Sequence, residues 1–168
     1  MSLSTHRGVD QYGHKYSNTV WDFEHDVVVF GCEPPLLFDI KEYGLLRKIN
    51  KVKAPYEDYG MTYDVMGGAL YLIEFKFEAK PLVKPPELFD TLPFKPYPTL
   101  RRYYYIFEHQ PVDYSGVFRI GKDFDFDFWQ GDEKAKPTTF RPEAYKQNGY
   151  IRFEKGKIVE IELHPRNE

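Results

Sequence analysis

The chain has 168 residues, a mass of 20.0 kDa and a formal net charge of −3, with 42% hydrophobic and 29% charged residues. This composition is typical of one folded globular domain and excludes a disordered chain. The negative charge argues against broad electrostatic binding to nucleic acid or to anionic membranes, so neither is expected as a partner.

The N-terminal residues and the cysteine content bear on where in the cell the protein is expected. Residues 1–18 are polar and contain no apolar run, so no signal peptide is predicted. The one cysteine, Cys32, excludes an internal disulfide and fits a reducing compartment. Because no stretch reaches the ~18 apolar residues of a membrane span, we expect a soluble, cytoplasmic protein. Residues 1–18 are expected to form a flexible segment and residues 19–168 a single antiparallel β-domain.

Short segments of alternating apolar and polar residues predict strands. The first covers residues 20–32, of which 27–30 are apolar enough for the centre of a sheet. In residues 69–80, Ile73 is expected to share the inner face of a strand with Phe75 and Phe77, while the charged residues between them face water. The preceding Gly67-Gly68 predicts a tight turn or a bulge.

The C-terminal residues 150–165 carry the clearest hairpin signal, and their register can be argued. A two-residue loop would pair Ile151 with Glu160, which places an apolar side chain opposite a charged one. A three-residue loop over residues 154–156 instead pairs Ile151 with Val159 and supplies a glycine for a left-handed position. The pattern therefore favours the three-residue loop.

Two short helices are predicted, over residues 34–44 and 141–149. Gly44 is a stop signal for the first helix. Pro142 is a start signal for the second, and Asn148-Gly149 would end it.

Residues 81–98 contain six prolines in 18 residues, which predicts a crossover and not sheet. The apolar side chains between the prolines predict that this Pro-rich segment packs against the domain, either as a lid over a pocket or as a connection between two half-sheets. The predicted fold is therefore mostly β, an antiparallel curled barrel or sandwich with one or two short helices and a long Pro-rich crossover over residues 81–98.

Aromatic residues are unusually frequent, with 14 Phe, 14 Tyr and 2 Trp. Most of them are expected in the core, but such side chains also line ligand pockets. The leading functional expectation is a non-enzymatic domain that binds a small molecule without a cofactor, with Tyr71, Phe75, Tyr104 and Phe126 around the ligand. The first alternative is an interaction module whose exposed aromatic and charged face binds a protein partner or a second copy of the chain.

Three Asp residues alternate with Phe in residues 121–134. In a strand, Asp123, Asp125 and Asp127 would lie about 6.7 Å apart on one face. Repulsion at that distance costs only about 0.6 kcal/mol in water, so the simplest interpretation is a solvated strand face. The functional interpretation is a site for a divalent cation (Mg²⁺, Mn²⁺ or Ca²⁺), to which Asp132 and Glu133 would add negative charge. A hydrolase of phosphate esters or nucleotides is therefore the second alternative.

Residues 103–128 resemble the aromatic strand and the following Asp-x-Asp-x-Asp strand of a family of small metal-dependent nucleoside di- and triphosphate phosphatases. The resemblance implies a β-barrel in which Asp123, Asp125 and Asp127 help to bind the metal. The chain departs from the family at Phe107, where the family has Asn, and in its C-terminal third.

Two further patterns are weaker candidates. Cys32 would be a nucleophile if His25 lay beside it, although a buried inert thiol is the commoner outcome. The basic and aromatic residues in 45–53 and 101–105 suit single-stranded nucleic acid, but equally suit a solvated strand rim.

Overall fold

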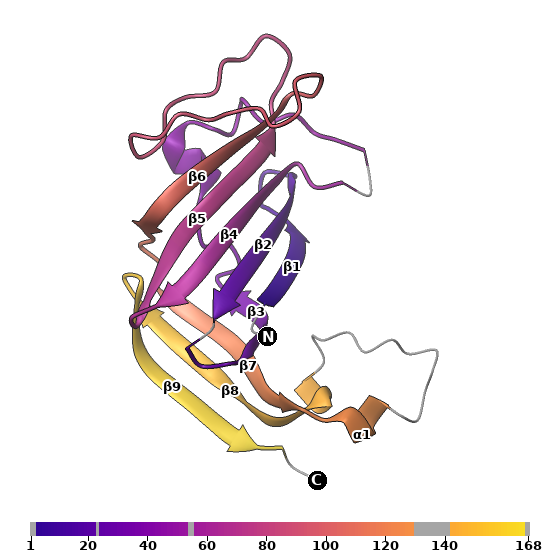
Figure 1. The fold of residues 1–168 in the computed structure, drawn as a ribbon, viewed down its shortest axis with the longest axis vertical. Helices are drawn as coiled ribbons and strands as arrows, with labels where there is room; N and C mark the ends of the chain where they lie inside the picture. Colours follow the sequence, from indigo (N-terminus) through magenta and orange to yellow (C-terminus); the bar gives the residue numbers. More distant parts are fainter. Residues whose placement is uncertain (1–2, 23, 54–55, 130–141, 167–168) are drawn as a thin grey trace.

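The computed structural model describes residues 3–22, 24–53, 56–129 and 142–166, which form one curled sheet (Figure 1). The strands are β1 (Leu3–Val9), β2 (Lys15–Asp22), β3 (Val28–Glu33), β4 (Tyr59–Met66), β5 (Ala69–Glu78), β6 (Arg102–Pro111), β7 (Gly116–Phe124), β8 (Tyr145–Glu154) and β9 (Lys157–Pro165). Their order in the sheet is β1-β2-β4-β5-β9-β8-β7-β3, and β6 pairs with β5 outside this path. The sheet is a nearly closed barrel, which confirms the predicted mostly-β curled barrel.

The two ends of this order, β1 and β3, meet along what we call the barrel seam. The backbone N–H of Val29 on β3 donates a hydrogen bond to the Oγ of Ser4 on β1 at 2.7 Å. In Figure 1, β1, β2, β4, β5 and β6 lie side by side, and β7, β8 and β9 run below them. The described strand pairs are antiparallel except for β2 with β4, which is parallel.

The first strand pair corrects the expectation of a flexible segment over residues 1–18. The β1–β2 ladder runs from Leu3 opposite Trp21 to Val9 opposite Lys15. The buried side chains of this ladder include Ser4 and Asn18, which share a face with the fully buried Val20, so the inner face is partly polar. The prediction of strands relied on apolar alternation, so only residues 20–22 of β2, at the start of the strand predicted over residues 20–32, were expected to be strand.

The C-terminal hairpin has a two-residue turn, so the predicted three-residue loop is wrong. Lys155 and Gly156 both have positive φ, and Glu154 pairs with Lys157. The ladder shifts register between Arg152 and Phe153, so Ile151 pairs with Ile161 and not with its expected partner Val159. A bulge in β9 thus resolves the mismatch between apolar and charged side chains, and the loop keeps two residues.

A second bulge changes the inner face of β5. Both neighbouring ladders skip Ile73, because β4 and β6 pair with Leu72 and then with Glu74. Ile73 is only partly buried, whereas Leu72 and Phe75 are fully buried on either side of it. The predicted inner position of Ile73 is therefore corrected. The preceding Gly67-Gly68 forms the predicted tight turn, with both residues at positive φ.

Helical structure is limited to single turns in the described residues. The 3₁₀ turn η1 (Ile40–Tyr43) is capped by the Asp39 side chain and ends at Gly44, which has a φ of 70°. The turn α1 (Phe126–Trp129) follows β7, and the turn η2 (Pro142–Ala144) directly precedes β8. None of these helices is long and apolar enough to cross a membrane.

The helix predicted over residues 141–149 is reduced to η2, and Asn148-Gly149 lies inside β8. A Cβ atom on Gly149 would lie 1.7 Å from the carbonyl oxygen of Glu162 on β9. Glycine is therefore needed here for the close approach of two strands, and not as a helix stop.

The Pro-rich segment forms no named strand, as predicted, and makes only isolated bridges such as Phe94 with Tyr104. Figure 1 shows it as loops beyond the upper ends of β5 and β6. Its packing is less complete than predicted. Leu88 is buried and Phe89 packs on the core, but the exposed side chains include Leu82, Leu92, Phe94 and Tyr97.

Candidate functional site

The four aromatic residues predicted to surround a ligand lie in different environments. Phe75 is fully buried in the core, whereas Phe126 is 68% exposed. Tyr71 is half-buried on β5 and makes an edge contact with His109 at 5.6 Å between ring centroids. Tyr104 is half-buried on β6, next to the Pro-rich segment. The structure therefore does not bring these four side chains together around one cavity.

The Asp-rich stretch leaves the sheet before its alternation is complete, because β7 ends at Phe124. Asp123 has a positive φ of 60°, and its carboxylate accepts a hydrogen bond from Gln147 Nε2 at 2.7 Å. Asp125 follows the strand, and its backbone N–H donates to the Ala144 carbonyl at 2.7 Å. The predicted row of three carboxylates on one strand face is therefore corrected.

Asp125 has the role of a structural anchor. Its side chain is 13% exposed; one carboxylate oxygen accepts from the backbone N–H of Asp127, and the other lies 2.7 Å from Arg166 Nη2. Among the described residues, no group of three or more His, Cys, Asp or Glu side chains could hold a metal ion. Asp132 and Glu133 lie outside the described residues. The described carboxylates thus do not supply the metal site that the hydrolase alternative requires.

We expect Asp125→Asn to lower the free energy of unfolding by about 1–3 kcal/mol, because the partly buried Arg166 loses its carboxylate partner. Urea unfolding in EDTA measures this change, and Asp127→Asn is the matched control because that side chain is exposed. If Asp125 belonged to an empty metal site, Asp125→Asn would instead raise the free energy of unfolding, because it would remove one of several negative charges that repel one another. A more stable Asp125→Asn variant would contradict the structural role.

Cys32 and His25 do not form a nucleophile pair. The Nδ1 atom of His25 lies 2.9 Å from the Oδ2 of Asp22, which is fully buried. Burial raises the pKa of the Cys32 thiol to about 12, and the nearby Arg119 charge offsets this only in part. Because the thiolate is the reactive form, Cys32 is an inert thiol at neutral pH.

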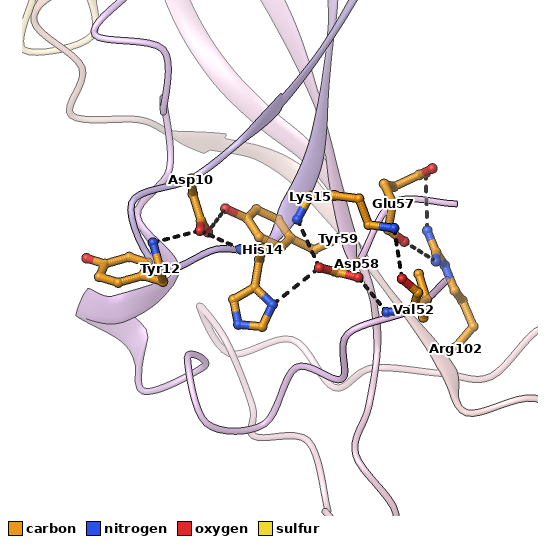
Figure 2. Close-up of polar contacts among 9 residues, drawn as sticks. All are labelled: Asp10, Tyr12, His14, Lys15, Val52, Glu57, Asp58, Tyr59 and Arg102. Atoms are coloured by element: carbon orange, nitrogen blue, oxygen red, sulfur yellow. Dashed lines mark hydrogen bonds and ion pairs between the residues drawn. The ribbon is translucent and has the colours of Figure 1, made fainter. Parts of the chain in front are cut away.

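A buried polar network joins the β1–β2 turn to the start of β4 (Figure 2). Asp10 accepts hydrogen bonds from the backbone N–H groups of Tyr12 and His14, each at 2.9 Å, and from the Tyr59 hydroxyl at 2.6 Å. Burial and the Asp10 hydrogen bond raise the pKa of Tyr59 far above its ordinary value. Tyr59 therefore stays a neutral donor, and Asp10 holds the turn in place.

Asp58 forms the second half of this network, on the right in Figure 2. Its carboxylate accepts from the backbone N–H groups of Lys15 at 2.9 Å and Val52 at 2.7 Å, and it lies 3.4 Å from His14 Nδ1. The Lys15 contact joins residues that are 43 apart along the chain. Because both carboxylate oxygens are used for backbone N–H groups, we assign the network to folding and not to catalysis.

Among the described pockets, the one with the most Phe and Tyr side chains in its lining lies between η1, the Pro-rich segment and residues 110–113. We call it the aromatic pocket, and its volume is about 130 Å³. The rings of Phe38 and Tyr43 stack with centroids 4.7 Å apart, and Phe89 meets Tyr43 edge-on at 5.1 Å. Phe38 also contacts Phe75, so the pocket rests on the rigid aromatic core.

Three carboxylates line the aromatic pocket: Asp39, Glu42 and Asp113. The described residues that line the pocket include no Lys, Arg or His. Burial raises the pKa of Tyr43, and the charges of Glu42 and Asp113 raise it further. The carboxylates therefore create a negative potential at the aromatic rings.

The residues that line the aromatic pocket were not predicted from the sequence. Phe38 and Tyr43 fall within a predicted helix, and Phe89 falls within the Pro-rich crossover, so only the fold brings them together. The one sequence feature that could have indicated this pocket is the clustering of acidic and aromatic residues in 38–43. Comparison with protein-family models, curated proteins and solved structures finds no match to this chain.

Proposed function

We propose that this protein is a non-enzymatic, cytoplasmic small-molecule-binding protein and that its ligand carries a positive charge, as an organic ammonium does. The observation that carries the proposal is the aromatic pocket, in which Phe38, Tyr43 and Phe89 lie beside three carboxylates and no described basic side chain. The cytoplasmic location is supported by Cys32, which is a free cysteine.

The chemistry of the lining favours an organic cation over a neutral or anionic ligand. A cation near an aromatic ring gains about 0.5–2 kcal/mol from the ring quadrupole, with the larger values in desolvated sites. Tyr43 and Phe89 provide such rings, and Glu42 and Asp113 lie in the same lining. An anion would meet both like charges and the negative faces of the rings, so the pocket discriminates by charge.

The pocket is also supported from below, which limits the ordering cost of binding. Leu37, Phe38 and Val112 are buried, so the floor keeps its shape without a ligand. Asp39 accepts a hydrogen bond from the Lys41 backbone N–H at 3.0 Å and thereby fixes the first turn of η1. Asp39 therefore contributes charge from a fixed position.

Calorimetric titration with choline, compared with 3,3-dimethylbutan-1-ol, tests this function. The two probes have nearly the same shape, but only choline is charged. We expect saturable choline binding and binding of the neutral probe that is weaker by about tenfold or more, equivalent to about 1.4 kcal/mol.

Two variants locate the binding. Tyr43→Ala removes an aromatic wall and Asp113→Asn removes one carboxylate, and each is expected to weaken choline binding about three- to tenfold. Their matched controls are Tyr97→Ala and Asp127→Asn, at exposed positions outside the pocket. Equal binding of the two probes, or an equal loss in the controls, would contradict the proposal.

The alternative of a protein-interaction module is supported by the exposed apolar side chains of the Pro-rich segment, among them Leu82 and Leu92. These side chains do not identify the chemistry of a partner. The aromatic pocket, in contrast, indicates the charge and the size of its ligand. Ligand binding is therefore better supported than the interaction module.

A further inference from the structure

A second pocket opens at the barrel seam, and we call it the seam pocket. Its volume is about 220 Å³, and β1, β2, β3 and β7 contribute to its lining. The polar side chains that line it include Arg7, Asn18, Glu33 and Arg119. It shares no lining residue with the aromatic pocket, and its character is basic and not acidic.

The side chain of Arg119 lies across β3 at Gly31. It pairs with Gly31 in the β3–β7 ladder, directly after a register shift between Val29 and Gly31. A Cβ atom on Gly31 would lie 2.8 Å from the Arg119 Nη2 atom. The absence of a side chain on Gly31 therefore lets the guanidinium lie close to the β3 backbone, within the lining of the pocket.

The seam pocket has an excess of positive charge. Arg7 and Arg119 both line it, and neither guanidinium forms an ion pair or side-chain hydrogen bond with the residues that the structure describes. Glu33 is the one carboxylate among the described lining residues. Burial and the Arg119 charge lower the pKa of His6, so this imidazole is neutral at neutral pH. Two guanidiniums in this position are donors that suit an oxyanion.

Asn18 supplies the complementary acceptor. Its side chain is 2% exposed, and its Nδ2 donates to the Pro35 carbonyl at 2.9 Å, which fixes the orientation of the amide. Its Oδ1 is buried and has no hydrogen-bond partner among the described residues. Because buried acceptors without a partner are rare, this oxygen points to a donor that arrives with a bound molecule.

We propose that the seam pocket binds a small oxyanion that also carries a hydroxyl hydrogen, such as a monohydrogen phosphate group or an α-hydroxycarboxylate. Arg7 and Arg119 bind the oxyanion through charge-assisted hydrogen bonds. The hydroxyl group of the ligand donates to Asn18 Oδ1. This site is independent of the proposed cation-binding function.

Calorimetric titration with inorganic phosphate and with sulfate, at pH 7.5 and constant ionic strength, tests the proposal. Both ions are tetrahedral dianions, but only monohydrogen phosphate has a hydroxyl hydrogen to donate to Asn18. We expect phosphate to bind about tenfold more tightly than sulfate. Glycolate and acetate provide the same comparison for carboxylates, because only glycolate has a hydroxyl group. Whichever of phosphate and glycolate binds with the higher affinity identifies the class of ligand.

Two variants separate the two halves of the site. Arg119→Gln is expected to weaken phosphate binding about tenfold or more, whereas Arg47→Gln, at an exposed arginine outside the pocket, leaves it unchanged. Asn18→Leu removes the acceptor and is expected to bring the ratio of phosphate to sulfate affinity close to one. If Asn18→Leu does not fold, the ratio of phosphate to sulfate affinity of the wild-type protein still tests the role of Asn18.

Absence of saturable phosphate and glycolate binding to the wild-type protein would overturn the proposal. Equal affinity for phosphate and sulfate, together with equal affinity for glycolate and acetate, would overturn the role of Asn18. Choline binding is expected to be unchanged in Arg119→Gln, so failure at one pocket is distinguishable from failure at the other.

Discussion

Phe75→Ala is expected to lower the free energy of unfolding by about 3–5 kcal/mol, the typical cost of deleting a fully buried aromatic side chain. The Phe75 ring is completely buried and packs against Phe38 at 5.5 Å and Phe77 at 5.6 Å between centroids. The substitution would leave a cavity that its rigid aromatic neighbours cannot fill. Urea unfolding followed by fluorescence measures the change, with the midpoint shifting at constant slope.

The matched control for Phe75→Ala is Phe126→Ala, because the sequence predicted the same ligand-lining role for both residues. Phe126 is 68% exposed and contacts Phe124 at 5.1 Å. Its replacement is expected to cost at most about 1 kcal/mol. If Phe75→Ala were no more harmful than Phe126→Ala, Phe75 would line an open cavity and not the core.

Asp58→Ala is expected to lower the free energy of unfolding by about 3–4 kcal/mol, because two buried backbone N–H groups lose their acceptor. Asp58 is 1% exposed, and its two oxygens accept from Lys15 and Val52. Asp58→Asn keeps one carbonyl acceptor and is expected to cost less than the alanine variant. Chemical unfolding of both variants provides the comparison.

The control for Asp58→Ala is Asp113→Ala, at an exposed carboxylate of the aromatic pocket. This change is expected to alter stability by less than about 0.5 kcal/mol. A small effect of Asp58→Ala, similar to that of Asp113→Ala, would contradict the folding role of the buried polar network. The network would then be available as a functional site.

Much of the barrel could be predicted from the sequence, because alternation, turn glycines and prolines act locally. The strand at residues 69–78, the Gly67-Gly68 turn and the strand-free Pro-rich segment follow from such local rules. The register of the C-terminal hairpin could not be predicted in this way. It depends on a bulge in β9, and a bulge is set by packing across the barrel and not by the two turn residues.

Strand β1 and most of β2, of which only residues 20–22 fell within a predicted strand, were missed for a different reason. Asn18, Ser4 and Asp10 face the interior and are satisfied, in part, by distant groups such as Pro35 and Tyr59. A buried polar face has the same sequence pattern as a solvated loop, so only the three-dimensional partners reveal it.

The candidate site was the least predictable feature, since both pockets depend on contacts between distant segments. The aromatic pocket combines Tyr43, Phe89 and Asp113, which no sequence spacing connects. The Asp-rich stretch had the more conspicuous pattern, but β7 ends within it and Asp125 pairs with Arg166. The repeated Asp–Phe motif therefore marks the end of a strand and a structural ion pair. The proposed function rests instead on the residues of the aromatic pocket, which form no sequence motif.

An NMR titration of the ¹⁵N-labelled protein with choline chloride reports both whether the cation binds and where it binds. We expect saturable shifts of the backbone amides of Phe38, Tyr43, Phe89 and Asp113, while the amides around Arg119 in the seam pocket stay unchanged. Saturable shifts centred elsewhere, or no saturable shift at the aromatic pocket, would contradict the proposed cation-binding function.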